Sequence, residues 1–291
     1  CPLRSNHNTG IRHLMPRFTT SDGLSLHFED QGDGPPVLCL AGLTRNHADF
    51  TYLMPHLADY RVIRLDYRGR GQSDYASDFM TYNILREGQD AIELLDHLGI
   101  EKTVLIGTSR GGLIAMALAC SHAHRLAGVV LNDIGPAVTD VGIERIMDYV
   151  GKTPPFANLD QAAVALSMGF AASFTDVSPE RWREVAGFMY VENPEGGVSN
   201  LYDPKLRDAL VGQAGTGESI DLWTLFDGLR SLPHATIRGE NSDLFAAETL
   251  VAMQDRHPDM IATTVPGRGH VPFLDEPEAL AVIRALLDRM T

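Results

Sequence analysis

The stretch Val104–Gly112, which reads VLIGTSRGG, decides the fold that we expect for this chain. Its apolar first part predicts a buried strand, and the apolar residues 113–120, LIAMALAC, predict a helix directly after it. Glycine at positions 107 and 111 removes the Cβ atoms that would clash where a strand reverses into a helix. Such a turn presents the Ser109 hydroxyl clear of the sheet, with the next backbone N–H at a helix N-terminus. We therefore interpret Ser109 as a nucleophile.

Short apolar runs alternate with amphipathic segments over the rest of the chain. They lie at residues 37–40, 62–65, 103–106, 128–131, 235–237 and 261–265. Each run is too short for a helix and too continuously apolar for a half-exposed strand, so we expect parallel strands that are covered on both faces. Asp22 and Gly23, between alternating residues, predict an antiparallel hairpin before them. The predicted fold class is α/β, with a mostly parallel, doubly wound sheet.

The alternation stops between residues 136 and 225, where the sequence shows helical patterns only. One of these helices opens at Ser178-Pro179, a favourable N-cap and first-turn pair. We predict a helical cap over 136–225, inserted into an α/β core made of 17–135 and 226–291. Residues 1–16 are expected to be an N-terminal extension, with Met15 as a candidate natural start.

Composition limits the possible partners and compartments. The net charge is −14 and the pI is near 5.1, which disfavours nucleic acid and anionic membrane surfaces as partners. The sequence has no run of 18 apolar residues and no signal-peptide core near its start. Cys39 and Cys120 lie in apolar segments and are expected to be buried thiols of a reducing compartment. We therefore expect a cytoplasmic protein whose partner is a small-molecule substrate.

A serine hydroxyl needs a base to take its proton, and the base needs a third group to orient it. His270 is the favoured base because it ends the glycine-flanked loop VPGRGH after the last apolar run. His47 is the alternative.

The acid that orients His270 has three candidates. Asp243 is favoured because it lies in the turn after the run 235–237, between serine and histidine in chain order. Glu240, in the same turn, is a second candidate. Asp133 also ends an apolar run, but it could instead be a cap or turn residue that supports the start of the cap.

An oxyanion formed during acyl transfer requires hydrogen-bond donors. The backbone N–H groups of Leu43 and Arg110 are the predicted pair, and Gly42 permits the close approach. The Arg110 side chain could contact an acidic substrate group or form a salt bridge at the surface. We interpret the segment 66–74, DYRGRGQSD, as a tight turn with internal hydrogen bonds. The glycine motifs lack the GxxxxGK[ST] arrangement, and neither a metal nor a nucleotide cofactor is predicted.

Several motifs together resemble the α/β-hydrolase superfamily across almost the whole chain. They are LAGLTRN at 40–46, DYRGRGQSDY at 66–75, GTSRGG at 107–112, NDIGP at 132–136, RGENSD at 238–243 and GRGH at 267–270. The resemblance implies an eight-stranded sheet, a helical cap, a Ser/Asp/His triad and no cofactor. Carried over by motif, Ser109 matches the nucleophile, Asp243 the acid and His270 the base, with the oxyanion donors at Leu43 and Arg110.

The chain is most similar to the enol-lactonase-like and esterase-like members of this superfamily. Serine at position 109 argues against its dehalogenases and epoxide hydrolases, which use an aspartate nucleophile. The leading hypothesis is a serine hydrolase that cleaves a small carboxylic ester or lactone through an acyl-enzyme. The alternatives are hydrolysis of a carbon–carbon bond in a vinylogous diketone, and a ligand receptor without turnover. The expected apolar roof of the pocket comprises Met147, Val150, Leu166, Met168, Phe170, Trp182, Phe188 and Met189.

Overall fold

The computed structural model of the chain describes residues 16–215 and 221–289. Most of the predicted N-terminal extension, residues 1–15, lies outside the described residues. Among the described residues, no helix is both long and apolar enough to cross a membrane.

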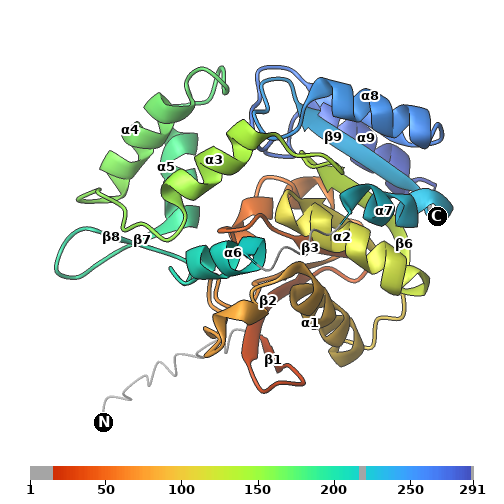
Figure 1. Ribbon diagram of the computed structural model, residues 1–291, viewed down its shortest axis with the longest axis horizontal. Coiled ribbons are helices and arrows are strands. Elements are labelled where there is room, and N and C mark those ends of the chain that lie inside the picture. Colours follow the sequence, from red (N-terminus) through yellow and green to blue (C-terminus); the bar gives the residue numbers. More distant parts are fainter. Residues whose placement is uncertain (1–15, 216–220, 290–291) are drawn as a thin grey trace, which may run out of the picture.

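An eight-stranded sheet forms the centre of the molecule, in the order β1-β2-β4-β3-β5-β6-β9-β10 (Figure 1). The strands are β1 (Arg17–Thr19), β2 (Ser25–Gln31), β3 (Pro36–Leu40), β4 (Arg61–Leu65), β5 (Thr103–Thr108), β6 (Leu126–Asn132), β9 (His234–Gly239) and β10 (Ile261–Val265). Strands β1 and β2 form the predicted hairpin, with Gly23 at φ +89°, and β2 pairs antiparallel with β4. All other neighbours in the sheet pair in parallel. The six predicted apolar runs are therefore all strands, and the predicted fold class is confirmed.

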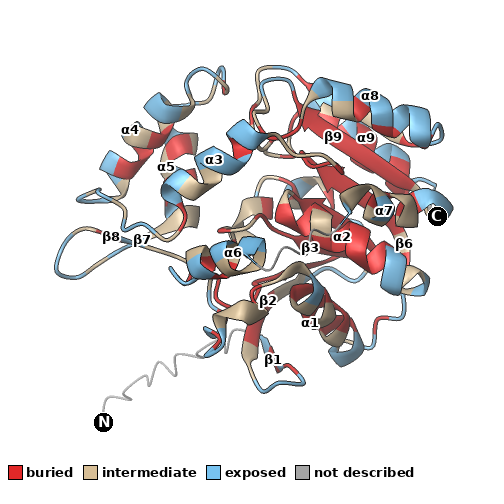
Figure 2. Ribbon diagram, viewed as in Figure 1, coloured by how far each residue is buried: buried red, intermediate tan, exposed pale blue. Residues whose placement is uncertain are grey.

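Helices cover both faces of this sheet. They are α1 (Ile84–His97), α2 (Arg110–Ser121), α7 (Leu222–Asp227), α8 (Ala247–Arg256) and α9 (Pro277–Leu287). One apolar core joins the sheet to α1, α2, α7 and α8, and a second joins its other face to α9. The inner strands β3, β5, β6 and β9 are almost entirely buried (Figure 2), as expected for a sheet between two helical layers. The sheet is doubly wound.

The segment between β6 and α7 forms a separate layer beyond the carboxyl ends of the strands (Figure 1). Its elements are α3 (Asp140–Tyr149), α4 (Leu159–Phe170), α5 (Pro179–Met189), β7 (Tyr190–Glu192), β8 (Val198–Asn200) and α6 (Leu206–Gly215). Ser178 caps α5 as predicted. The expectation of helices only is wrong, because β7 and β8 form a hairpin. Its turn uses Gly196 and Gly197 at φ +93° and +81°, a conformation that glycine adopts without strain.

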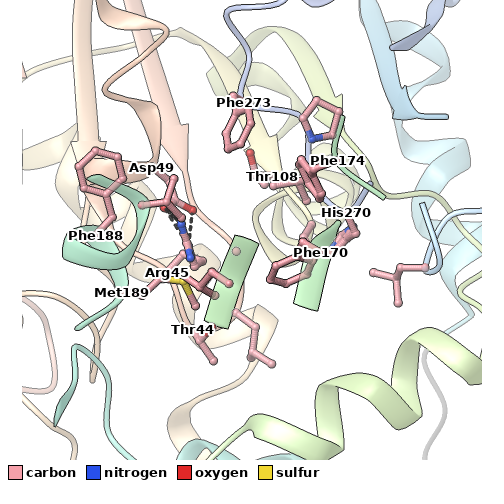
Figure 3. Close-up of a pocket in the computed structure, with 18 of the residues that line it drawn as sticks. Thr44, Arg45, Asp49, Thr108, Phe170, Phe174, Phe188, Met189, His270 and Phe273 are labelled. Carbon is pink, nitrogen blue, oxygen red and sulfur yellow. Dashed lines mark hydrogen bonds and ion pairs between the residues drawn. The ribbon is translucent and has the colours of Figure 1, made fainter. Parts of the chain in front are cut away.

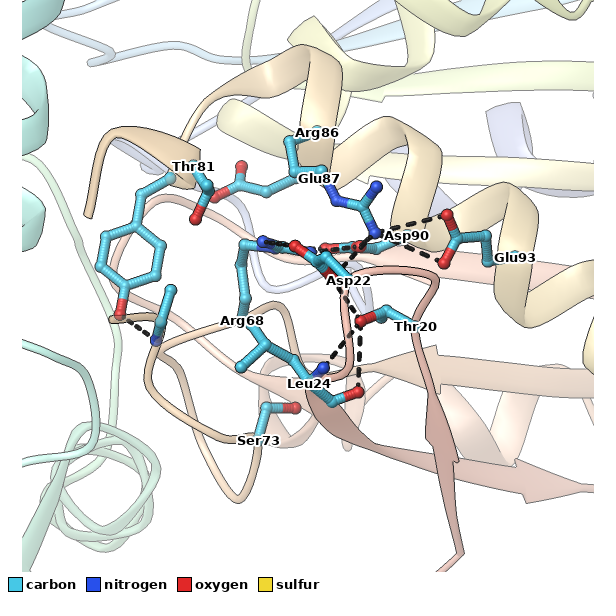
Figure 4. Close-up of polar contacts among 12 residues, drawn as sticks. Thr20, Asp22, Leu24, Arg68, Ser73, Thr81, Arg86, Glu87, Asp90 and Glu93 are labelled. Carbon is cyan, nitrogen blue, oxygen red and sulfur yellow. Dashed lines mark hydrogen bonds and ion pairs between the residues drawn. The ribbon is translucent and has the colours of Figure 1, made fainter. Parts of the chain in front are cut away.

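A buried ionic network fixes the segment 66–74 to the core (Figure 4). The Arg68 guanidinium donates to both oxygens of Asp90 on α1 at 2.7 Å and also to Asp22 in the β1–β2 hairpin. Arg86 donates to the same two carboxylates. Asp66 accepts hydrogen bonds from the backbone N–H groups of His47 and Gln72. The internal hydrogen bonds predicted for this turn are therefore present, and they tie the hairpin, the turn and α1 together.

The two described cysteines differ in exposure. Cys39 is fully buried in β3, as expected, and burial raises the pKa of its thiol to about 12. The expectation that Cys120 is buried is wrong, because it lies in the last turn of α2, where the helix runs out to the surface.

Candidate active site

Ser109 occupies the strained turn that the sequence predicts. Strand β5 ends at Thr108 and α2 begins at Arg110, which leaves Ser109 alone at the apex with φ 50° and ψ −113°. A Cβ at Gly107 would lie 2.4 Å from the carbonyl oxygen of Gly111, and one at Gly111 would lie 2.0 Å from that of Leu40. Both positions therefore require glycine, and a positive φ at serine indicates strain of the kind found at functional sites.

His270 contacts this serine. It follows β10 in a loop at the same edge of the sheet, and its Nε2 lies 2.9 Å from the Ser109 Oγ. The alternative base, His47, is engaged elsewhere, since its Nδ1 lies 2.9 Å from the Asp66 Oδ1. The structure thus brings His270, rather than His47, to the candidate nucleophile.

Asp133 is the acid that contacts the histidine. The Asp133 Oδ2 lies 2.7 Å from the His270 Nδ1, and the aspartate is fully buried. Thr108 and Asn132 are paired in parallel on β5 and β6. The next residues along the two strands, Ser109 and Asp133, therefore emerge side by side, and both have positive φ.

Two further donors hold the Asp133 carboxylate in place. The backbone N–H of Gly239 donates to Oδ1 at 2.7 Å, and the Ser242 hydroxyl donates to Oδ2 at 2.6 Å. Both come from the end of β9 and its turn, the place where the acid had been expected. That turn supports the acid instead of supplying it.

The expectation that Asp243 contacts His270 is wrong. The Asp243 Oδ2 instead accepts a hydrogen bond at 2.5 Å from the Arg145 guanidinium on α3. The Asp243 backbone oxygen accepts a hydrogen bond from the Thr139 hydroxyl, so both of these hydrogen bonds join Asp243 to the cap. Glu240 accepts from the Gly267 N–H at 2.9 Å. The available signal for Asp133 was its place directly after a strand whose neighbour in the sheet is β5.

The predicted oxyanion donors lie at the same edge. Neither the Leu43 N–H nor the Arg110 N–H donates a hydrogen bond to any residue that the structure describes. The Arg110 side chain contacts neither the cavity nor the surface, contrary to both alternatives. It is buried, and its Nε lies 2.5 Å from the Glu87 carboxylate, which also binds Arg70 at 2.6 Å. Arg110 therefore anchors the start of α2 to α1.

A cavity of about 310 Å³ lies over Ser109, between the core and the cap (Figure 3). Five residues of the expected roof line it: Leu166, Phe170, Trp182, Phe188 and Met189. Three do not: Met147, Val150 and Met168. Val150 is buried against Tyr202 and Leu206, and Met168 is 75% exposed on the outer face of α4. The helical periodicity could not separate the residues that line the cavity from those that do not, because the cap helices pack against each other as well as facing the cavity.

Two ion pairs lie in the wall of the cavity. Arg45 pairs with Asp49 on the core side, and Arg145 pairs with Asp243 where α3 meets the core. The Tyr149 side chain also lines the cavity, and desolvation by the surrounding atoms raises the pKa of its hydroxyl. The phenol therefore remains a hydrogen-bond donor at neutral pH.

The described residues contain one cluster with metal-ligand chemistry, formed by His27, His47 and Asp66. Burial alone would raise the pKa of Asp66, but hydrogen bonds from the two histidines hold it well below its usual range. The Asp66 oxygens already contact two backbone N–H groups and two imidazole rings. We therefore interpret the cluster as a structural one that stabilises the turn after β4.

The fold and the Ser109–His270–Asp133 arrangement define the class of protein to which this chain belongs. Residues 35–177 match the family model of the alpha/beta hydrolase fold. The chain is 33% identical over 268 residues to the 3-hydroxybutyrate-oligomer hydrolase of Cupriavidus necator, covering 88% of this chain and 90% of that protein. The chain therefore belongs to the α/β-hydrolase family.

Solved structures agree with this assignment. An alpha/beta hydrolase from Novosphingobium aromaticivorans is similar with a TM-score of 0.88 and 43% identity, covering 94% of this chain and 97% of that one. The E-2-(acetamidomethylene)succinate hydrolase has a TM-score of 0.80 at 24% identity, over 94% and 98% of the two chains. The second likeness concerns the fold alone.

Proposed function

We propose that this protein is a serine hydrolase that cleaves a small carboxylic ester or lactone through an acyl-enzyme, with Ser109, His270 and Asp133 as its triad. One observation carries the proposal, namely the continuous contact from the Ser109 hydroxyl through both nitrogens of His270 to the Asp133 carboxylate. This is the arrangement that acyl transfer at serine requires.

The proposed reaction begins when the Ser109 Oγ attacks the ester carbonyl while the His270 Nε2 takes its proton. Asp133 keeps the other ring nitrogen protonated and stabilises the imidazolium that forms. The oxyanion accepts hydrogen bonds from the N–H groups of Leu43 and Arg110, which have no other partner among the described residues. The alcohol then leaves with the proton from His270. Water, activated by the same base, releases the acid and restores Ser109.

One relative favours ester chemistry. The Cupriavidus necator protein is named for an oligomer of 3-hydroxybutyrate, and the units of such an oligomer are joined by ester bonds. Short esters of hydroxy acids are therefore the first substrates to try, ahead of lactones and vinylogous diketones. The cavity of about 310 Å³ is of a size for one small molecule.

A fluorophosphonate probe and a set of substrates test this proposal together. We expect the probe to label Ser109 in the folded protein and not in the Ser109→Ala variant, and nitrophenyl butyrate to be hydrolysed. Failure to label folded protein would favour a receptor without turnover. Labelling combined with a strong preference for vinylogous diketones would replace ester hydrolysis by carbon–carbon bond hydrolysis.

A further inference from the structure

Arg45 lies beside the nucleophile, and the mechanism above does not use it. It follows the oxyanion turn, and its stem packs on Gly42: a Cβ at that glycine would lie 3.3 Å from the Arg45 Cγ and 3.9 Å from the Ser109 Cβ. Both residues line the same cavity. Figure 3 shows Arg45 and its partner Asp49 on one side of this cavity and His270 on the other. The cavity that contains the reacting serine is therefore also lined by a cation.

Only part of this guanidinium is engaged by the protein. Its Nε lies 2.8 Å from both oxygens of Asp49, and its Nη2 lies 2.6 Å from one of them. Its Nη1 takes no part in the pairing with Asp49. Burial alone would lower the pKa of Arg45, but the Asp49 carboxylate outweighs this effect and raises the pKa above its ordinary value. Arg45 remains charged and retains N–H donors for another acceptor.

A second donor lies near the same guanidinium. Tyr190 lines the same cavity as Arg45, and desolvation raises the pKa of its hydroxyl, which therefore stays protonated at neutral pH. No hydrogen bond from the described residues contributes to this shift of its pKa. The wall also contains aromatic and aliphatic side chains and the polar side chains of Thr44, Tyr149 and Ser173, among others. A charged donor and a neutral donor that line one cavity are suited to bind an anion.

The other cation of the cavity, Arg145, is less available. Its Nη1 is taken by Asp243, its Nη2 lies 3.5 Å from the Gly169 carbonyl, and its guanidinium covers the Phe170 ring at 4.9 Å. Its side chain is 43% exposed, so water screens its charge more than that of Arg45, at 22%.

We propose that Arg45, together with the Tyr190 hydroxyl, binds a carboxylate of the substrate, so that the preferred substrate is an ester carrying a carboxylate a few atoms from the carbonyl that Ser109 attacks. The inference rests on the proposed function for the reaction, and it adds a substrate class. A guanidinium and a carboxylate in a partly dehydrated cavity form a strong, directional pair.

Matched esters test the substrate class. The 4-nitrophenyl monoesters of glutaric, adipic and pimelic acid are compared with the same compounds whose free acid is methylated. At the best chain length, we expect kcat/KM for the acid to exceed that for the methyl ester by about tenfold or more, the size of a charged hydrogen bond. Asp49→Asn removes the competing carboxylate and should raise this ratio. The double variant Arg45→Gln/Asp49→Asn should bring the ratio close to one.

Controls separate this inference from the proposed function. Arg183, whose partner Asp160 is exposed on the cap, does not line the cavity, and Arg183→Gln should leave the ratio unchanged. Hydrolysis of both ester classes with a ratio near one in the wild-type protein overturns the inference and leaves the function standing. The inference is also overturned, and the function left standing, if Arg145→Gln brings the ratio of the two kcat/KM values close to one while the double variant keeps the wild-type ratio.

Binding tests the inference even without turnover. In the Ser109→Ala variant, calorimetry should show that monomethyl adipate binds at least tenfold more tightly than dimethyl adipate, and that Arg45→Gln/Asp49→Asn removes the difference. If the wild-type protein hydrolyses neither ester but this preference is found, the carboxylate site stands and the proposed reaction fails. Equal binding of the two compounds overturns the site.

Discussion

The Asp133 Oδ2 lies 2.7 Å from the His270 Nδ1, at the end of the strand next to the one that carries Ser109. This contact favours the residue after β6, rather than the turn after β9, as the proposed acid. The carboxylate is fully buried and also accepts hydrogen bonds from Gly239 and Ser242. It therefore faces the imidazole in a fixed orientation, as a group that holds one histidine tautomer must.

Asp133→Asn should lower kcat for ester hydrolysis by a factor on the order of 10³ to 10⁴, because an amide holds His270 in the wrong tautomer. Asp243→Asn should lower it by about tenfold or less, because that carboxylate binds Arg145 of the cap. Steady-state kinetics on one nitrophenyl ester measures both, with thermal unfolding as the check on folding. A larger loss for Asp243→Asn would return the acid to the turn after β9.

Ser109→Ala should lower kcat by a factor on the order of 10⁴ to 10⁶, since it removes the nucleophile. The variant should unfold at about the temperature of the wild-type protein, because alanine keeps the Cβ of the half-buried Ser109 and loses only the contact of its hydroxyl with His270. Enzyme assays and calorimetry provide the two readouts. Esterase activity close to that of the wild-type protein would show that another residue attacks the ester.

Glu87→Gln should lower the free energy of unfolding by about 3 to 5 kcal/mol, because it leaves two buried guanidinium groups without their counterion. Glu87 is fully buried and binds Arg70 at 2.6 Å and Arg110 at 2.5 Å. Urea unfolding measures the loss. In the exposed pair of Arg183 and Asp160, Asp160→Asn is the matched control and should cost about 1 kcal/mol or less. Equal effects of the two variants would contradict this account of the network.

The free energy of unfolding should decrease as the pH is lowered below about 6.5, because a buried histidine pair becomes protonated. The Nε2 of His234 lies 3.0 Å from the Nδ1 of His257, and desolvation lowers the pKa of both from 6.5. Since the folded state favours their neutral forms, their contribution is complete above pH 6.5 and is lost as the pH falls through the lowered values. Urea unfolding from pH 7.5 to 5 measures this dependence.

The variant His257→Gln should show a shallower loss of stability over that range than the wild-type protein. His124, which is exposed, provides the control: His124→Gln should leave the pH dependence unchanged. Parallel curves for the wild-type protein and His257→Gln would mean that the buried pair does not contribute.

The elements that depend on local sequence were predictable. The glycines at 107 and 111, the apolar strand before them and the apolar helix after them are adjacent in the chain, and their steric requirements define the turn at Ser109. The six parallel strands follow from the same local reasoning. The β7–β8 hairpin was missed because α5 runs into β7 without a break in the sequence, and its pairing depends on a partner strand beyond a glycine turn.

The fold class, the turn at Ser109 and the loop that carries His270 can be derived from the amino-acid sequence, because each follows from residues close together in the chain. The acid that contacts the histidine depends on long-range packing. Strands β6 and β9 are neighbours in the sheet, and an aspartate follows each of them, Asp133 directly after β6 and Asp243 in the turn after β9, so both precede His270 in the chain and chain order does not choose between them. The contacts that each loop makes decide between them. Asp133, at positive φ, contacts His270, whereas Asp243 pairs with Arg145 of the cap.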